Sequence, residues 1–210
     1  MPHPPRTDRR QVLAAAIRMA EEVGPGAVTL RAVAVELDVS PSSLYHHVDD
    51  RADLLAGMAD QLLEDVPDPP PAPWPDRLRD LFLALRYAAH EHPRTFPLVL
   101  DHPHSRHLER LRLSGMEAVA EALSAAGAAR EHLAPCEAVV WTLLLGTVVR
   151  ESLGQFRHHR PGGPDAVAAA VLAAAAHHIA WVAADPAAAH RRDPGTEWAD
   201  DDPATAEVRW

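Results

Sequence analysis

Lysine is absent from this sequence of 210 residues, and cysteine occurs once, as Cys136. Every permanently cationic side chain is therefore an arginine. A single cysteine excludes a disulfide within the chain, and it is typical of a small buried residue in a reducing compartment. No basic segment followed by an apolar stretch opens the sequence, so we expect no signal peptide and a cytoplasmic protein.

The sequence has few cations for its number of acids, with a formal net charge of −10. This excludes a general nucleic-acid coat protein, which would be basic. Residues 1–64 carry 6 arginines against 10 acidic residues, so bulk charge does not favour DNA binding there either. Binding of DNA would depend on where single arginines are placed. The candidates are Arg6, Arg9, Arg10, Arg31 and Arg51.

One long segment, residues 166–184, contains no aspartate, glutamate or arginine. Its length alone would permit a membrane span. Most of the segment is alanine, and His177 and His178 lie inside it. This composition favours a helix packed within protein over one facing lipid.

Alanine and leucine supply much of the 47% of hydrophobic residues, which favours an all-α fold. Near the N-terminus, helical periodicity and capping residues predict four short helices. The first covers residues 8–23, the second starts after Thr29, the third is capped by Ser40, and the fourth by Asp49 or Asp50. Residues 38–40 form the tight turn between the second and third helices, as in a helix-turn-helix that places its last helix in the DNA major groove.

Six prolines within residues 67–75 predict an extended connector between two parts of the chain. We expect four segments. They are a DNA-binding domain with its linking helix at 1–66, the linker 67–75, a helical domain at 76–184, and an acidic, disordered tail at 185–210.

The second domain is predicted to be a helical bundle, with helices at 76–91, 94–100, 105–126, 132–156 and 165–184 and a loop at 157–164. The helices at 132–156 and 165–184 are apolar on nearly all sides and must be covered. Two such helices from each of two subunits would form a four-helix interface. The alternative is that both are central helices of a monomeric bundle.

The N-terminal motif resembles the TetR family of bacterial transcriptional regulators. The residues that carry the resemblance are TLRAVA at 29–34, VSPSSLYHHV at 39–48, and then Arg51 and Leu54-Leu55. Beyond them, only Trp74 to Leu81, with the pattern W-x-x-x-L-R-x-L, and the helix layout resemble a tetracycline-repressor-type C-terminal domain. Asp38 stands where the family has glycine, at a site that favours left-handed backbone.

The resemblance implies eight DNA-contacting residues, and His47 is a ninth candidate. Those expected at phosphates are Thr29, Ser40, Tyr45 and Arg51, and those expected at bases or the groove wall are Arg31, Ser42, Ser43 and His46. Arg31 could bind guanine with two hydrogen bonds. Packing is an equally good interpretation of Tyr45, and His47 either donates to a phosphate or packs against a helix.

The resemblance also implies a ligand pocket in the C-terminal domain. The candidates are Phe82, Arg86, Tyr87, His90, Phe96, Leu100, Met116, Trp141, Leu145 and His178. Each of them could equally be an ordinary core or surface residue.

Fourteen histidines leave a metal hypothesis open, because His102, His104 and His107 have ligand-like spacing. A helical metal-dependent hydrolase is therefore one alternative, and a scaffold that no longer binds DNA is another. No catalytic triad, HExxH pair or phosphate-binding loop is visible, so we expect no enzyme, cofactor or metal. The leading hypothesis is a homodimeric regulator, most simply a repressor. It would bind a palindromic DNA operator and be released by a small-molecule effector.

Overall fold

The structure is a computed structural model that describes residues 7–128, 130–155 and 163–184. Over these residues it consists of helices and turns without any β-strand, which confirms the predicted all-α fold. Residues 1–6, most of the predicted loop at 157–164 and the predicted tail at 185–210 lie outside the described residues.

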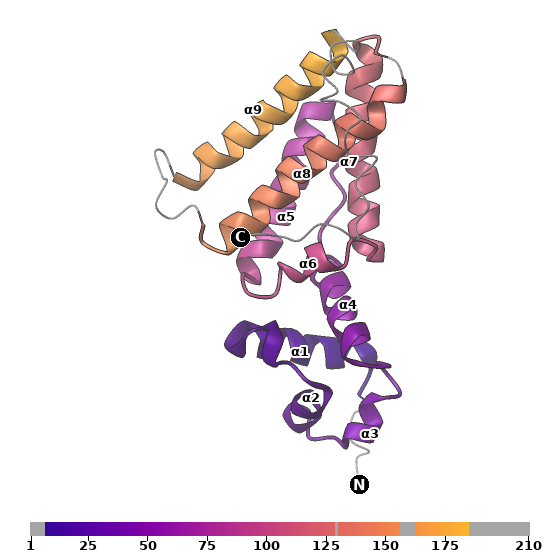
Figure 1. Cartoon of the computed structure of the whole chain (residues 1–210), viewed down its shortest axis with the longest axis vertical. Helices are drawn as coiled ribbons and strands as arrows, with labels where there is room; N and C mark the ends of the chain where they lie inside the picture. Colours follow the sequence, from indigo (N-terminus) through magenta and orange to yellow (C-terminus); the bar gives the residue numbers. More distant parts are fainter. Residues whose placement is uncertain (1–6, 129, 156–162, 185–210) are drawn as a thin grey trace, which may run out of the picture.

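The N-terminal unit is built from short helices (Figure 1). They are α1 (Arg9–Val23), the 3-10 turn η1 (Pro25–Ala27), α2 (Leu30–Glu36), α3 (Pro41–Leu44) and α4 (Arg51–Leu62). α3 is a single helical turn, followed by a non-helical turn at residues 45–47.

Local side-chain bonds explain where these helices begin. Asp8 caps α1 in a reciprocal capping box with Gln11. The backbone amide of Gln11 donates to the Asp8 carboxylate at 2.8 Å. Asp50, one of the two candidates, caps α4 by accepting the Asp53 amide at 2.8 Å. Asp38 adopts the left-handed backbone expected at the turn, with φ of 52°.

The core of this unit lies between α1, α2, α3 and α4. Ala16 and Ala20 of α1, Leu44 of α3 and Met58 of α4 are each fully buried in it. Leu98, which belongs to the C-terminal unit, packs into the same core. The two units are therefore joined by packing as well as by the chain.

The C-terminal unit contains the longer helices. They are α5 (Trp74–Glu91), α6 (Leu98–Asp101), α7 (Arg106–Ala125), the 3-10 turn η2 (Arg130–His132), α8 (Leu133–Ser152) and α9 (Gly163–Ala184). α5 starts two residues before the predicted helix, inside the predicted linker, because Pro75 occupies the first turn, where its missing N–H removes no helical bond.

The two units meet at the lower end of the bundle, where α4 reaches α6 and the start of α7 (Figure 1). Asp60 of α4 accepts the His107 amide at 2.9 Å. The Glu21 carboxylate of α1 accepts the Thr95 amide at 2.9 Å. These bonds fix the N-terminal unit to the loop before α6 and to the first turn of α7. α2 and α3 lie at the opposite end of the molecule from α9.

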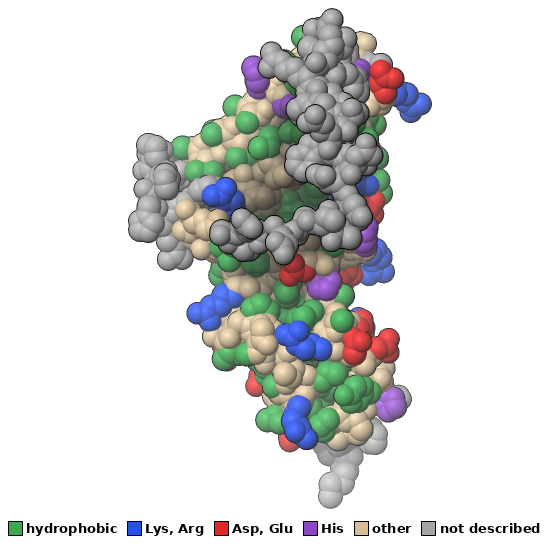
Figure 2. Space-filling model, in the orientation of Figure 1, with side chains coloured by type: hydrophobic (Ala, Val, Ile, Leu, Met, Phe, Trp, Pro, Cys, Tyr) green, Lys and Arg blue, Asp and Glu red, His purple; other side chains and the backbone are tan. Residues whose placement is uncertain are grey.

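Two helical segments, Arg130–Ser152 and Ala166–Ala184, are long and apolar enough to cross a membrane, and 39% and 22% of their most apolar windows are buried. Core helices of soluble proteins meet the same criteria. Figure 2 shows mainly hydrophobic and backbone atoms along α9 on the face in view. Much of this apolar surface is not covered by the residues that the structure describes.

Candidate DNA-binding surface and effector pocket

The turn between α2 and α3 is shaped by hydroxyl side chains. The Thr29 hydroxyl caps α2 by accepting the Ala32 amide at 3.2 Å. The Ser40 hydroxyl caps α3 by accepting the Ser43 amide at 3.3 Å, and Pro41 takes the first helical position. Both caps are those the sequence predicts.

Three serine hydroxyls gather at the start of α3. The Ser40 oxygen lies 2.9 Å from that of Ser42 and 2.8 Å from that of Ser43. A hydroxyl both donates and accepts, so this cluster can turn its hydrogens toward phosphate oxygens or base edges. The side chains are also short, so nothing bulky separates α3 from a surface placed against it.

The other side chains predicted to contact DNA border this cluster and differ in accessibility. Arg31 and His46 are exposed, and Tyr45 is 58% exposed, so packing does not account for Tyr45. His47 is half-buried, and its carbonyl accepts a hydrogen bond from the Arg9 guanidinium. The exposed side chains among the predicted residues thus come from the start of α2, from α3 and from the turn after it.

Arg9 is paired within the N-terminal unit, although its side chain remains 44% exposed. Its two terminal nitrogens donate to the Asp53 carboxylate at 2.8 and 2.6 Å. The hydrogen bond from Arg9 lowers the pKa of Asp53, and the same bond raises the pKa of Arg9. This arginine braces α1 against α4 and the turn at His47.

Arg51 is likewise occupied. Its Nε donates to the Val28 carbonyl at 3.0 Å, and its Nη2 donates to the carbonyls of Pro25 and Gly26 at 3.1 and 3.2 Å. The resemblance implies a phosphate contact for this residue. In the structure these nitrogens instead hold the loop between α1 and α2, directly before Thr29.

Of the five arginines considered for DNA binding, Arg6 lies outside the described residues, and Arg10 faces the C-terminal unit. Arg9 and Arg51 are bonded as above. Over residues 7–128, Arg31 is the one of these arginines that is exposed without a hydrogen bond or ion pair.

Three of the predicted pocket residues, Leu100, Trp141 and Leu145, line one cavity of about 700 Å³ between α6, α7 and α8. His104 and Thr142 also line it. The cavity therefore has an apolar wall with a few polar groups, as small-molecule sites commonly do.

The charged wall of this cavity, which the sequence analysis did not identify, is Arg112 and its partners. Its guanidinium donates to Glu109 at 3.0 and 2.8 Å and to Glu137 at 3.1 Å. The hydrogen bond from Arg112 lowers the pKa of Glu109 and raises that of Arg112 itself. Glu109 and Arg112 are three residues apart on α7, a spacing that favours such a pair, whereas Glu137 comes from another helix.

The remaining pocket candidates are not brought to this cavity. Phe82 and Phe96 are fully buried in the core, and Met116 is half-buried. Tyr87 is 70% exposed and lines a different cavity.

The last three candidates are also elsewhere. Arg86 binds Glu151 through two hydrogen bonds of 2.7 and 2.8 Å, and His90 lies 3.6 Å from the same carboxylate. The ring of His178 packs at a tilt against Trp181, and burial lowers its pKa.

His102, His104 and His107 do not converge as the ligands of a metal site would. The His107 ring lies 3.1 Å from the Asp60 carboxylate, which joins the two units. His104 lines the α6–α8 cavity instead. In the described part of the chain, no three histidine, cysteine, aspartate or glutamate side chains converge on a possible metal position. The metal-dependent enzyme therefore has no geometric support there.

Residues 12–58 match the family model described as bacterial regulatory proteins, tetR family. The N-terminal unit is therefore that of a TetR-family regulator. This DNA-binding regulator family accounts for the arrangement of α1 to α4, and its members are transcriptional regulators and not enzymes. No curated protein matches the sequence significantly.

Solved structures of transcriptional regulators share the fold of this chain over most of its length. BioQ from Mycobacterium smegmatis is 24% identical, with a TM-score of 0.62 over 82% of this chain and 99% of BioQ. BioQ with its double-stranded DNA operator is 25% identical, with a TM-score of 0.64 and the same two coverages. A TetR variant from Acinetobacter baumannii in complex with minocycline is 23% identical, with a TM-score of 0.61 over 84% of this chain and 96% of TetR.

Proposed function

We propose that this protein is a homodimeric, cytoplasmic repressor that binds a palindromic operator and is released by a small molecule. The observation that carries the proposal is the exposed surface of Arg31, the serine cluster, Tyr45 and His46, at the end of the molecule remote from α9. The solved complex of BioQ with operator DNA supports a DNA-binding role for the corresponding unit.

The apolar surface of α8 and α9 supports the dimer. Val139 of α8 and Trp181 of α9 are 41% and 43% exposed, and the described side chains of α9 include no acid or arginine. A second copy would cover this surface as a four-helix interface. In such a dimer two α3 helices about 34–36 Å apart would reach successive major grooves of a palindrome.

The cavity between α6, α7 and α8 is the proposed effector site. α6 links it to the DNA-binding unit, because Leu100 lines the cavity and Leu98 packs into the N-terminal core. His107, at the start of α7, holds Asp60 of α4. An effector that moves α6 would move α4, and with it α3, so effector and operator would oppose each other through one coupling free energy.

The direct test is fluorescence anisotropy of the full chain with duplex DNA from the region flanking its own gene, at several salt concentrations. We expect salt-sensitive binding of a palindrome by a dimer. Arg31→Ala should reduce discrimination between base sequences by about 1–3 kcal/mol. Arg79→Ala, a control at an exposed arginine of α5 paired with Asp76, should leave binding unchanged.

Light scattering gives the second readout, with a dimeric mass as the expected result. A monomer, or a dimer that binds flanking and unrelated DNA equally at low salt, would count against the proposed function. Unchanged specificity in Arg31→Ala would reject only the role of that side chain.

A further inference from the structure

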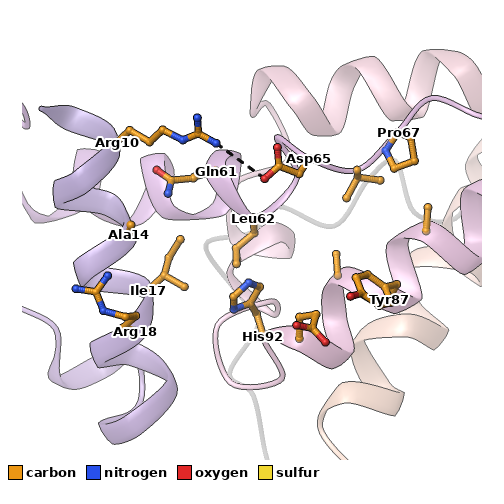
Figure 3. A pocket seen from close by; sticks show the side chains of 14 residues that line it. Arg10, Ala14, Ile17, Arg18, Gln61, Leu62, Asp65, Pro67, Tyr87 and His92 are labelled. Atoms are coloured by element: carbon orange, nitrogen blue, oxygen red, sulfur yellow. Dashed lines mark ion pairs between the residues drawn. The ribbon is translucent and has the colours of Figure 1, made fainter.

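A second cavity, of about 590 Å³, lies between the two units, away from the proposed effector site (Figure 3). One wall is α1, another is the end of α4 with the following loop, and the third is α5. Its apolar surface includes Ile17, Leu62, Ala84 and Ala88. No residue of this cavity lines the α6–α8 cavity.

Two arginines of α1, Arg10 and Arg18, border this cleft, and both are only loosely paired. Arg10 lies 3.5 Å from Glu64 and 3.9 Å from Asp65, and Arg18 lies 3.8 Å from Glu36. These separations exceed those of a charge-assisted hydrogen bond, such as the bonds of 2.6 to 2.8 Å between Arg9 and Asp53. Their guanidinium groups therefore retain donors for an anion.

His92 adds a polar group that lacks a partner. It is half-buried, lines the cleft, and its Nδ1 atom is buried without a hydrogen bond among the described residues. Figure 3 shows Arg18 and His92 at one end of the cleft and Arg10 with Asp65 at the other. Because Nδ1 has no exposed surface, a ligand in the cleft would contact His92 only through the part of the ring that lines the cleft.

We propose that this cleft binds an amphipathic organic anion, with its apolar body against α4 and α5 and its carboxylate at Arg18 and His92. The apolar floor fits an aliphatic or aromatic body, and the loosely paired guanidinium groups fit the charge. Glu91 also lines the cleft at α5 and opposes an anion there, so it lowers the affinity of the site. The site is separate from the effector site, and its occupancy would fix the angle between the two units.

The test is isothermal titration of the full chain with decanoate and, as a cation of similar apolar length, decyltrimethylammonium. We expect one decanoate per chain and much weaker binding of the cation. Arg18→Gln should weaken decanoate binding about fivefold. Arg10→Gln should weaken it less, because Arg10 lies at the other end of the cleft, and Glu91→Gln should tighten it. Arg79→Gln is the matched control on α5 and should change nothing.

Two cavity-filling variants locate the bound anion. Ala84→Trp, which fills the cleft, should abolish decanoate binding, whereas Leu100→Trp, which fills the α6–α8 cavity, should preserve it. Absence of decanoate binding, equal affinity for both charges, or retention in Ala84→Trp with loss in Leu100→Trp would overturn the proposal. If Ala84→Trp does not fold, an unchanged affinity in the double variant Arg10→Gln with Arg18→Gln overturns it equally.

Discussion

Replacing Arg51 by alanine is the change that best separates a DNA contact from a structural role at the recognition surface. Three hydrogen bonds join its guanidinium to the carbonyls of Pro25, Gly26 and Val28. These carbonyls belong to the loop that leads into Thr29, the cap of α2. Loss of the guanidinium would leave the entry to α2 without this support.

The magnitude follows from the number and setting of these bonds. Hydrogen bonds from a charged donor contribute about 1.5–3 kcal/mol each when buried. Here the side chain is exposed and two of the bonds share one nitrogen, so we expect Arg51→Ala to lower the free energy of unfolding by about 2 kcal/mol. Operator affinity should fall as well. In the free variant α2 would be less ordered, and part of the binding free energy would be used to order it.

Urea denaturation and the salt dependence of DNA binding decide between the two roles. A lost phosphate contact would reduce the slope of log affinity against log salt by about 0.9 per contact, with little change in stability. The structural role predicts reduced stability and an unchanged slope. Arg51→Lys is informative as a control, since it keeps the charge but cannot form all three bonds. A normal urea midpoint together with a reduced salt slope in Arg51→Ala would refute the reasoning.

Three further changes test other parts of the molecule. Ser42→Trp should abolish operator binding with an unchanged melting temperature, because the side chain is exposed and stands at the front of α3. Gly57→Val should cost about 2 kcal/mol by urea denaturation, since a Cβ there would lie 2.8 Å from a methyl group of Leu13, and a normal midpoint would contradict this. Glu151→Gln should cost about 3 kcal/mol, because it breaks a buried pair with Arg86. Burial alone would raise the pKa of Glu151, but the bond from Arg86 outweighs it and lowers the pKa below its ordinary value of 4.5. The pair therefore stabilises fully above that value and is lost as the pH falls through the lowered pKa, an acid sensitivity that Glu151→Gln should reduce.

Interactions between near neighbours in the chain were predictable from the sequence. The caps at Thr29, Ser40 and Asp50 each bond an amide three residues ahead, so residue type and spacing are sufficient to find them. The left-handed backbone at Asp38 was expected from the family resemblance, since Asp38 stands where the family has glycine. Helical periodicity predicted the long helices for the same reason. The spacing of apolar residues within one segment shows which face of that helix is buried, without reference to the rest of the chain.

Interactions between distant segments could not be predicted in this way. The partners Arg86 and Glu151 are 65 residues apart, and Arg51 is 26 residues from Pro25. A sequence shows that an arginine is present but not which carbonyl or carboxylate the packed helices bring to it. Pocket residues were equally hard to assign. Phe82 and Trp141 are both aromatic residues in apolar helical segments. Phe82 is fully buried in the core, whereas Trp141 lines a cavity.

The acidic composition and a DNA-binding role are compatible because the arginines of the N-terminal unit serve different purposes. Arg9 and Arg51 use their charge on a carboxylate and on backbone carbonyls inside the unit, and they thereby position α2 and α3. The surface itself consists mostly of hydroxyl, phenol and imidazole groups around Arg31. Such groups bind at short range with defined geometry, while few cations are available for attraction at long range. Selectivity would then depend on the fit of α3 to one operator, and the overall negative charge would disfavour binding to unrelated DNA.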